Sequence, residues 1–109
     1  MVISAVKANL RRAWTVAEMG AIVGVSDAHL RRMFARGIGR SPKDLLNDFR
    51  LQAAAQLLSD PSIRIKEIQA QVGILDGSHF CRHFRRRYGL SPKEFRSNAL
   101  KEIVARKSA

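Results

Sequence analysis

An internal duplication of the chain limits the folds that it can adopt. Three consecutive segments recur in order, 16–24 as 65–73, 26–38 as 76–88, and 41–44 as 91–94. The offset is 49 residues for the first segment and 50 for the others, so the second turn holds one inserted residue. Each copy has the pattern of two short helices joined by a glycine-containing turn, which is typical of a helix-turn-helix unit. The sequence therefore predicts two such units in tandem.

Periodicity and capping signals predict seven helices and no strand, an all-α fold. Four signals mark where helices begin or end: the capping box Thr15-Val-Ala-Glu18, a left-handed cap at Gly24, an N-cap at Ser26, and Ser41-Pro42 at the start of a long helix. We expect a first helix-turn-helix lobe over residues 1–40, a linker helix over residues 41–58 and a second lobe over residues 59–109.

Helical spacing also predicts which side chains are buried. The expected inward faces are Ile3, Val6, Leu10 and Ala13 on a first helix over residues 2–12, Leu30, Phe34, His29 and Met33 on the third helix, and Phe80, Phe84 and His79 on the sixth. The opposite faces of the third and sixth helices carry arginines, and neither helix contains the glutamates that usually balance a solvated basic face. These faces are therefore candidates for contact with a polyanion.

The charge of the chain favours the same partners. Twenty Lys and Arg stand against nine Asp and Glu, a formal net charge of +11, while 46% of the residues are hydrophobic. A folded body with this excess attracts nucleic acid or an anionic membrane surface. The single cysteine, Cys81, cannot form an internal disulfide, and no secretory signal or membrane-spanning run is readable. A reducing cytosol is the expected location.

Because the second helix of a helix-turn-helix unit can enter a DNA major groove, we expect helices 27–36 and 77–87 to read bases. The candidate base-reading residues are Asp27, Ala28, Arg31, Arg32, Gly77, Ser78, Cys81, Arg82 and Arg85. Arg32 and Arg82 occupy equivalent places and can each present a bidentate fork to guanine. Arg31 and Arg85 can read bases or clamp phosphates. Asp27 can accept from cytosine N4 or complement the helix dipole as a first-turn acid.

Affinity without sequence preference is expected from phosphate contacts. The candidates are Thr15, Arg36, Arg40, Lys43, Ser62, Arg64, Arg86 and Lys93, with Thr15 and Ser62 acting through backbone N–H groups at helix starts. A linker helix of about 25 Å would set the two reading helices roughly one DNA turn, ~34 Å, apart. One chain would then fill two successive major grooves.

Five other functions are alternatives to DNA reading. His79 and His83 have metal-ligand spacing, but no second ligand pair accompanies them. Neither a catalytic triad nor a glycine-rich phosphate loop appears, so we expect no enzyme, cofactor or metal. Arginines near Cys81 can activate its thiol, although a small groove-facing residue is the simpler interpretation. Residues 80–88 alone suit a membrane surface, and charge alone suits a sequence-neutral DNA packer.

The arrangement Gly24-Val-Ser-x-x-His-Leu-x-Arg-x-Phe34, with Gly39-x-Ser-Pro42, Arg50-Leu-x-x-Ala-x-x-Leu-Leu58 and Phe80-x-Arg-x-Phe84, resembles the DNA-binding domain of AraC/XylS-type transcription regulators over nearly the whole chain. The resemblance implies a bacterial, cytoplasmic, nucleoid-associated activator domain that binds asymmetric promoter sites as a monomer and touches RNA polymerase. It also implies near-constant arginines at Arg32 and Arg82.

Three residues depart from the family pattern. Ile74 replaces an aromatic residue and is expected still to fill the core, Gln69 replaces a small residue between the fifth and sixth helices, and Arg64 replaces a capping Ser or Thr for which Ser62 is expected to compensate. Such regulators usually carry a sensing or dimerisation domain before this one. We therefore expect the chain to be a C-terminal fragment of a larger regulator, which could dimerise through that further domain, or else a short family member without a sensor.

Overall fold

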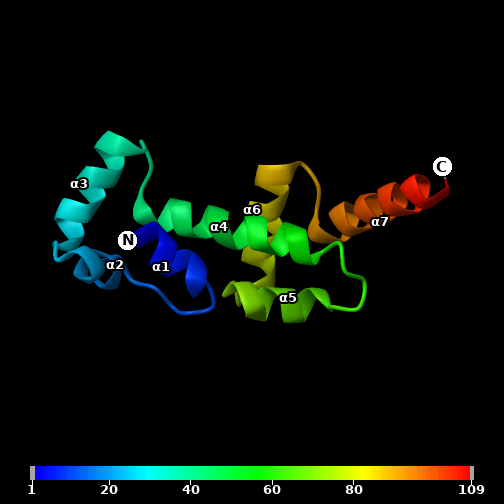
Figure 1. Cartoon of the computed structure of the whole chain (residues 1–109), viewed down its shortest axis with the longest axis horizontal. Helices are drawn as coiled ribbons and strands as arrows, with labels where there is room; N and C mark the ends of the chain where they lie inside the picture. The colour runs from blue at the N-terminus through cyan, green and yellow to red at the C-terminus, as the bar shows by residue number, and fades with distance from the viewer. Residues whose placement is uncertain (1, 109) are drawn as a thin grey trace. The chain divides into compact units, whose positions relative to one another are not determined.

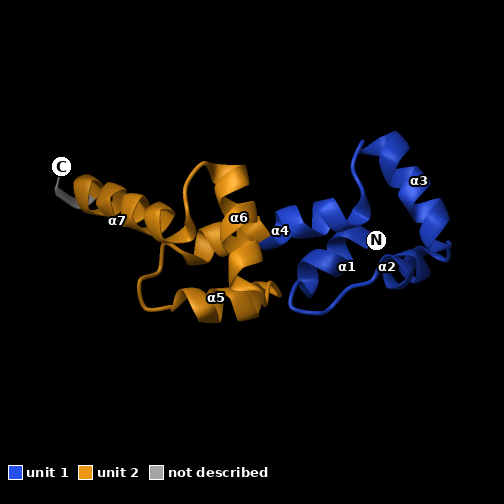
Figure 2. Cartoon of the chain, turned by 180° about the vertical axis from the view of Figure 1, so that it is seen from behind, with its two compact units in different colours: residues 1–50 blue, residues 51–109 orange. Residues whose placement is uncertain are grey.

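The computed structural model describes residues 2–108, with side chains to residue 106, as seven helices and no strand within that range (Figure 1). The helices are α1 (Val2–Ala8), α2 (Val16–Val23), α3 (Asp27–Gly37), α4 (Pro42–Leu57), α5 (Ile65–Val72), α6 (Gly77–Tyr88) and α7 (Pro92–Ser108). The predicted all-α fold is confirmed. The chain divides into two compact units, residues 1–50 and residues 51–109 (Figure 2). Because the division falls inside α4, each unit includes one part of that helix.

The predicted capping signals are present. The Thr15 side chain accepts from Glu18 N, and the Thr15 N–H donates to the Glu18 carboxylate, which completes the capping box. Ser26, Ser41 and Ser91 each accept a hydrogen bond from the backbone N–H three residues on, at 3.1–3.2 Å. These bonds satisfy donors that a helix leaves unpaired in its first turn. The starts of α2, α3, α4 and α7 are therefore fixed by the local sequence.

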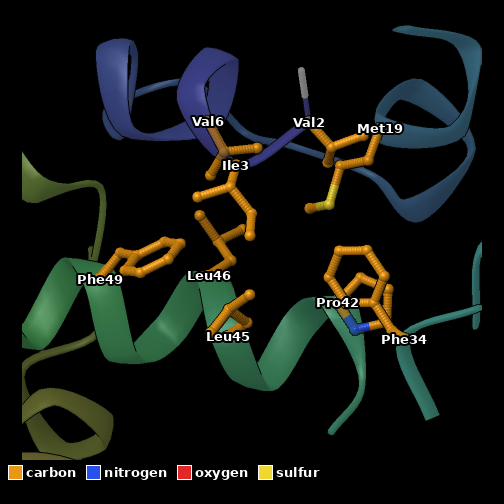
Figure 3. Close-up of a pocket in the computed structure, with 9 residues that line it drawn as sticks. All are labelled: Val2, Ile3, Val6, Met19, Phe34, Pro42, Leu45, Leu46 and Phe49. Atoms are coloured by element: carbon orange, nitrogen blue, oxygen red, sulfur yellow. The ribbon is translucent and has the colours of Figure 1, made fainter. Parts of the chain in front are cut away.

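Unit 1 encloses a core contributed by its four helical segments. The buried residues are Val2, Val6, Val16, Met19, Leu30 and Leu46. In Figure 3 side chains of α1 point toward Leu45, Leu46 and Phe49 of α4, with Met19 and Phe34 beside them. The cavity among them is only about 10 Å³, at the limit for one water molecule. α1 therefore packs closely on the first part of α4.

The first helix is shorter than predicted, and its buried face differs. α1 ends at Ala8 instead of Arg12, and the indole of Trp14 donates to the Asn9 carbonyl at 2.9 Å. Val2 and Val6 are buried, Leu10 is half-buried against the core, and Ile3 and Ala13 are exposed. Beyond Ala8 the chain continues in turns, with Asn9 N donating to Val6 O and Arg12 N to Asn9 O, and Arg50 holds the carbonyls of Leu10 and Arg12.

The predicted inward face of the third helix is also partly wrong. Leu30 is buried and Phe34 is half-buried against the core, but His29 and Met33 are exposed. α3 rests on α2 along a narrow stripe, so only the residues on the i and i+4 positions of that stripe are covered. The helix also continues through Gly37, and the left-handed residue that ends the segment is Gly39, with φ of 76°.

Unit 2 has the larger aromatic core. Its buried residues are Leu51, Ala54, Leu58, Ile68, Val72, Ile74, Phe80 and Phe84. The Phe84 ring lies 4.6 Å from Tyr88 and 5.3 Å from Phe95, measured between ring centroids. The predicted burial of Phe80, Phe84 and Ile74 is confirmed. His79 is only half-buried, because its ring stacks on His83 at 3.9 Å instead of entering the core.

In each unit an arginine binds backbone carbonyls of the loop that precedes α2 or α5. Arg50 donates to the carbonyls of Leu10 and Arg12, and Arg96 donates to those of Leu58, Asp60 and Ile63. Burial lowers the pKa of Arg50, and the carbonyls compensate part of that desolvation. The two loops are therefore held by the same kind of arginine–carbonyl hydrogen bonds although their sequences differ.

The fifth helix begins without a side-chain cap. Arg64 is its N-cap residue and makes no capping hydrogen bond. The expectation that Ser62 compensates is wrong, because both its N–H and its hydroxyl donate to Asp60, at 2.9 and 2.6 Å. These two bonds lower the pKa of Asp60. Ser62 therefore closes a turn before α5 instead of capping the helix.

Candidate nucleic-acid interface

α3 presents its polar face to solvent because its opposite face is anchored at Leu30. Ala28, Arg31 and Arg32 are exposed on it, as is Asp27 in its first turn. Asp27 Oδ2 lies 3.3 Å from a guanidinium nitrogen of Arg31, so the acid and the base one turn later form an ion pair. This pairing adds a third role to those considered for Asp27, since it orients Arg31.

α6 presents an equivalent face above the buried pair Phe80 and Phe84. The expected base-reading residues on it, Gly77, Ser78, Cys81, Arg82 and Arg85, are all exposed. The helix starts at Asp76, whose side chain accepts from Ser78 N at 2.9 Å and His79 N at 3.2 Å. The backbone N–H groups of His79 and Ser78 lower the pKa of the Asp76 carboxyl.

The four arginines on the two faces differ in what holds them. Arg31 pairs with Asp27, and Arg85 lies 3.4 Å from Glu94 of α7. Arg32 and Arg82 make no hydrogen bond or ion pair with any residue that the structure describes. Their guanidinium groups are therefore free to present all five donors to a ligand. The two positions that the duplication makes equivalent are also the two that are unpaired.

The expected phosphate-binding residues fall into two groups. Arg36, Lys43, Arg64, Arg86 and Lys93 are exposed, with Arg64 at 4.0 Å from Glu67. Thr15, Ser62 and Arg40 already use the expected donors internally. The Thr15 and Ser62 N–H groups donate to Glu18 and Asp60, and Arg40 pairs with Asp48, which raises the Arg40 pKa. The first group is better placed for phosphate than the second.

Basic charge is spread over both units. Residues 1–50 hold nine of the 20 Lys and Arg and four of the nine Asp and Glu, or +5, and residues 51–109 hold eleven and five, or +6. Each unit by itself therefore attracts polyanions. Among the described residues no helix is long and apolar enough to cross a membrane, and no group of three potential metal ligands occurs.

Two contacts at this interface were missed from the sequence. Glu94 accepts from Ser91 N at the start of α7 and also reaches Arg85, and nothing in linear spacing signals a contact between positions nine residues apart. The Asp27–Arg31 pair had a readable signal, because an acid four residues before a base is a favourable helical spacing.

The comparisons with known proteins agree with this geometry. A family model described as a helix-turn-helix domain matches residues 19–98. A crystal structure of an AraC-type DNA-binding domain-containing regulator from Chromobacterium violaceum superposes with a TM-score of 0.83 and 30% identity, covering 90% of this chain and 88% of that one. The chain belongs to the AraC/XylS-type helix-turn-helix family.

Other relatives carry more specific descriptions. The lactose operon transcription activator of Staphylococcus xylosus is 32% identical over 91 residues, which cover 84% of this chain and 33% of that protein. The DNA-binding domain of AdpA, a global transcriptional factor solved in complex with a target DNA, superposes with a TM-score of 0.82 and 25% identity, covering 89% of this chain and 87% of that one. The fold and the relatives of the present chain are those of DNA-binding transcription regulators, not of enzymes.

This AraC/XylS-type chain spans about a third of the length of the curated relatives that it matches. The shared part is therefore the helix-turn-helix region, and properties of the longer proteins belong to the proposals below.

Proposed function

We propose that this chain binds double-stranded DNA sequence-specifically by placing α3 and α6 in two successive major grooves, with Arg32 and Arg82 each reading a guanine. The observation that carries the proposal is that both guanidinium groups lack a hydrogen-bond or ion-pair partner among the described residues and occupy equivalent positions on exposed helix faces. A bidentate arginine–guanine contact contributes ~1–3 kcal/mol of discrimination.

The supporting residues have distinct roles in this proposal. Arg31 and Arg85, each oriented by an acid, contact phosphates or neighbouring bases. The exposed cations Arg36, Lys43, Arg64, Arg86 and Lys93 neutralise phosphates and give affinity without sequence content. Ala28, Gly77, Ser78 and Cys81 are small residues that let the helices approach the base edges.

Selection from a randomised duplex pool at physiological salt tests the base-reading assignment. The wild-type chain is expected to enrich a motif with two blocks about one helical turn apart. Arg32→Ala should relax one position of one block, and Arg82→Ala one position of the other. Enrichment of no motif would indicate binding by charge alone, and loss of the same position in both variants would contradict the assignment of one groove to each helix.

We further propose that the bound domain activates transcription in the bacterial cytoplasm by touching RNA polymerase as a monomer on DNA. Support comes from the family and from the relative described as an activator. Run-off transcription with purified polymerase, from templates that carry the selected motif upstream of a promoter, should rise when the protein is added. A fall in transcript on every template would identify a repressor instead.

A further inference from the structure

The two helix-turn-helix turns differ in length and in the residue that faces them. In unit 1 a single residue, Val25, separates the cap Gly24 from the N-cap Ser26. In unit 2 two residues, Ile74 and Leu75, separate the corresponding caps. Ile74 is buried, whereas the Leu75 side chain is 85% exposed. Leu75 is therefore the inserted residue, and it makes no contribution to the core.

In the shorter turn the backbone itself excludes a side chain from α2. A Cβ atom added at Gly20 would lie 2.5 Å from the carbonyl oxygen of Val25. Backbone atoms cannot move away cheaply, so this position accepts only glycine without a shift of the turn. The start of α3 is thus set by direct backbone contact with α2.

In the longer turn of unit 2, the carbonyl oxygen equivalent to that of Val25 belongs to Ile74, and it accepts a hydrogen bond from a side chain. Gln69 is the duplication partner of Gly20, and its Nε2 donates to the Ile74 carbonyl oxygen at 3.4 Å. The backbone bond beneath is the same in both units, from Val25 N to Gly20 O at 2.9 Å and from Ile74 N to Gln69 O at 3.0 Å. At this carbonyl the two units therefore differ in the side chain of residue 20 or 69 and in the inserted residue.

The Gln69 amide also reaches the first residue of α6. A Cβ atom at Gly77 would lie 3.7 Å from its Nε2 and 3.9 Å from its Oε1, which is ordinary packing distance. The side chain therefore fills the space that the longer turn opens between α5 and α6. Gln69 is half-buried there, so both its volume and its donor are in use.

We propose that Gln69 is a positioning residue that fixes where α6 starts, and with it the placement of Arg82, in the role that backbone contact at Gly20 has for α3. This inference rests on the proposed function, since it assigns Gln69 to the precision of the base reading by α6. Gln69 itself touches no base.

Gln69→Met tests the donor while keeping the volume, and Gln71→Met, on an exposed position of the same helix, is the matched control. In the randomised selection, Gln69→Met should lower discrimination in the block read by α6 by about 2- to 10-fold, the range for one lost hydrogen bond. Discrimination in the α3 block and the salt slope should not change. A parallel loss in both blocks, or no loss in either, would overturn the proposal.

Amide hydrogen exchange separates this inference from the proposed function. If the wild-type chain selects no motif, the proposed function fails, but the position of α6 can still be judged without DNA. Gln69→Met should speed exchange at Ser78 and His79, in the first turn of α6, and leave His29 in the first turn of α3 unchanged. Unchanged exchange in α6 would contradict a positioning role for Gln69.

Deletion of Leu75, alone and combined with a substitution at Gln69, tests whether the turn length depends on the side chain at residue 69. Deleting Leu75 alone should bring the shortened turn against the Gln69 side chain and lower the melting temperature. Combining the deletion with Gln69→Gly recreates the arrangement of unit 1 and should recover much of that loss. If the combined variant is no more stable than the deletion alone, turn length and residue 69 are not coupled.

Discussion

Among single residues, the proposed function divides the exposed cations into those expected to read bases and those expected to neutralise phosphates. Lys43 is exposed in the first turn of α4 and presents a point charge without fixed geometry. Lys43→Ala should weaken binding to every duplex alike and flatten the salt slope by about one unit, while Arg82→Ala weakens only cognate duplex. Fluorescence anisotropy on cognate and scrambled duplexes at several salt concentrations measures both. Sequence-dependent loss in Lys43→Ala would place that residue against a base.

The close approach at Gly20 gives a second prediction at this scale. Gly20→Ala should destabilise the chain by ~1–3 kcal/mol, because the added methyl meets the Val25 carbonyl. Gly37→Ala is the control, since that helical glycine has open space around it and the substitution should stabilise by about 0.5–1 kcal/mol. Chemical denaturation of both variants measures the difference. Equal effects at the two glycines would mean that the turn after α2 can shift at little cost.

At the scale of an element, the start of α6 depends on the ionised Asp76 cap. Because the folded state lowers the pKa of Asp76, the cap stabilises the fold above the ordinary aspartate pKa of about 4, and this stabilisation is lost as the pH falls through the lowered value. Asp76→Asn keeps a neutral acceptor and should weaken this part of the acid sensitivity. Melting temperatures of the two proteins between about pH 7 and pH 3 provide the measurement, and identical profiles would contradict a titrating cap.

At the scale of the whole molecule, the two cores are built from separate sets of residues. The only tryptophan, Trp14, lies in unit 1, and the only tyrosine, Tyr88, packs on Phe84 in unit 2. Phe84→Ala should remove ~3–5 kcal/mol of packing from unit 2. Thermal unfolding followed by Tyr88 should therefore shift much further than unfolding followed by Trp14. Equal shifts in the two signals would show that the units unfold as one.

The duplicated architecture, the helix caps and the exposed arginine faces could all be predicted from the amino-acid sequence. Each depends on residues close together in the chain: Ser26 caps its own helix, and Phe80 and Phe84 share a face because they are one turn apart. The equivalence of Arg32 and Arg82 follows from the repeat in the same way.

Features that depend on contacts between distant positions could not be predicted from the sequence. Arg50 binds two carbonyls about forty residues away in the loop after α1, and the exposure of Met33 reflects how narrowly α3 rests on its neighbours. The tertiary structure also showed which arginines are held by acids and what Gln69 touches. Periodicity gives the direction in which a side chain points, but the partner that it meets depends on how the helices pack.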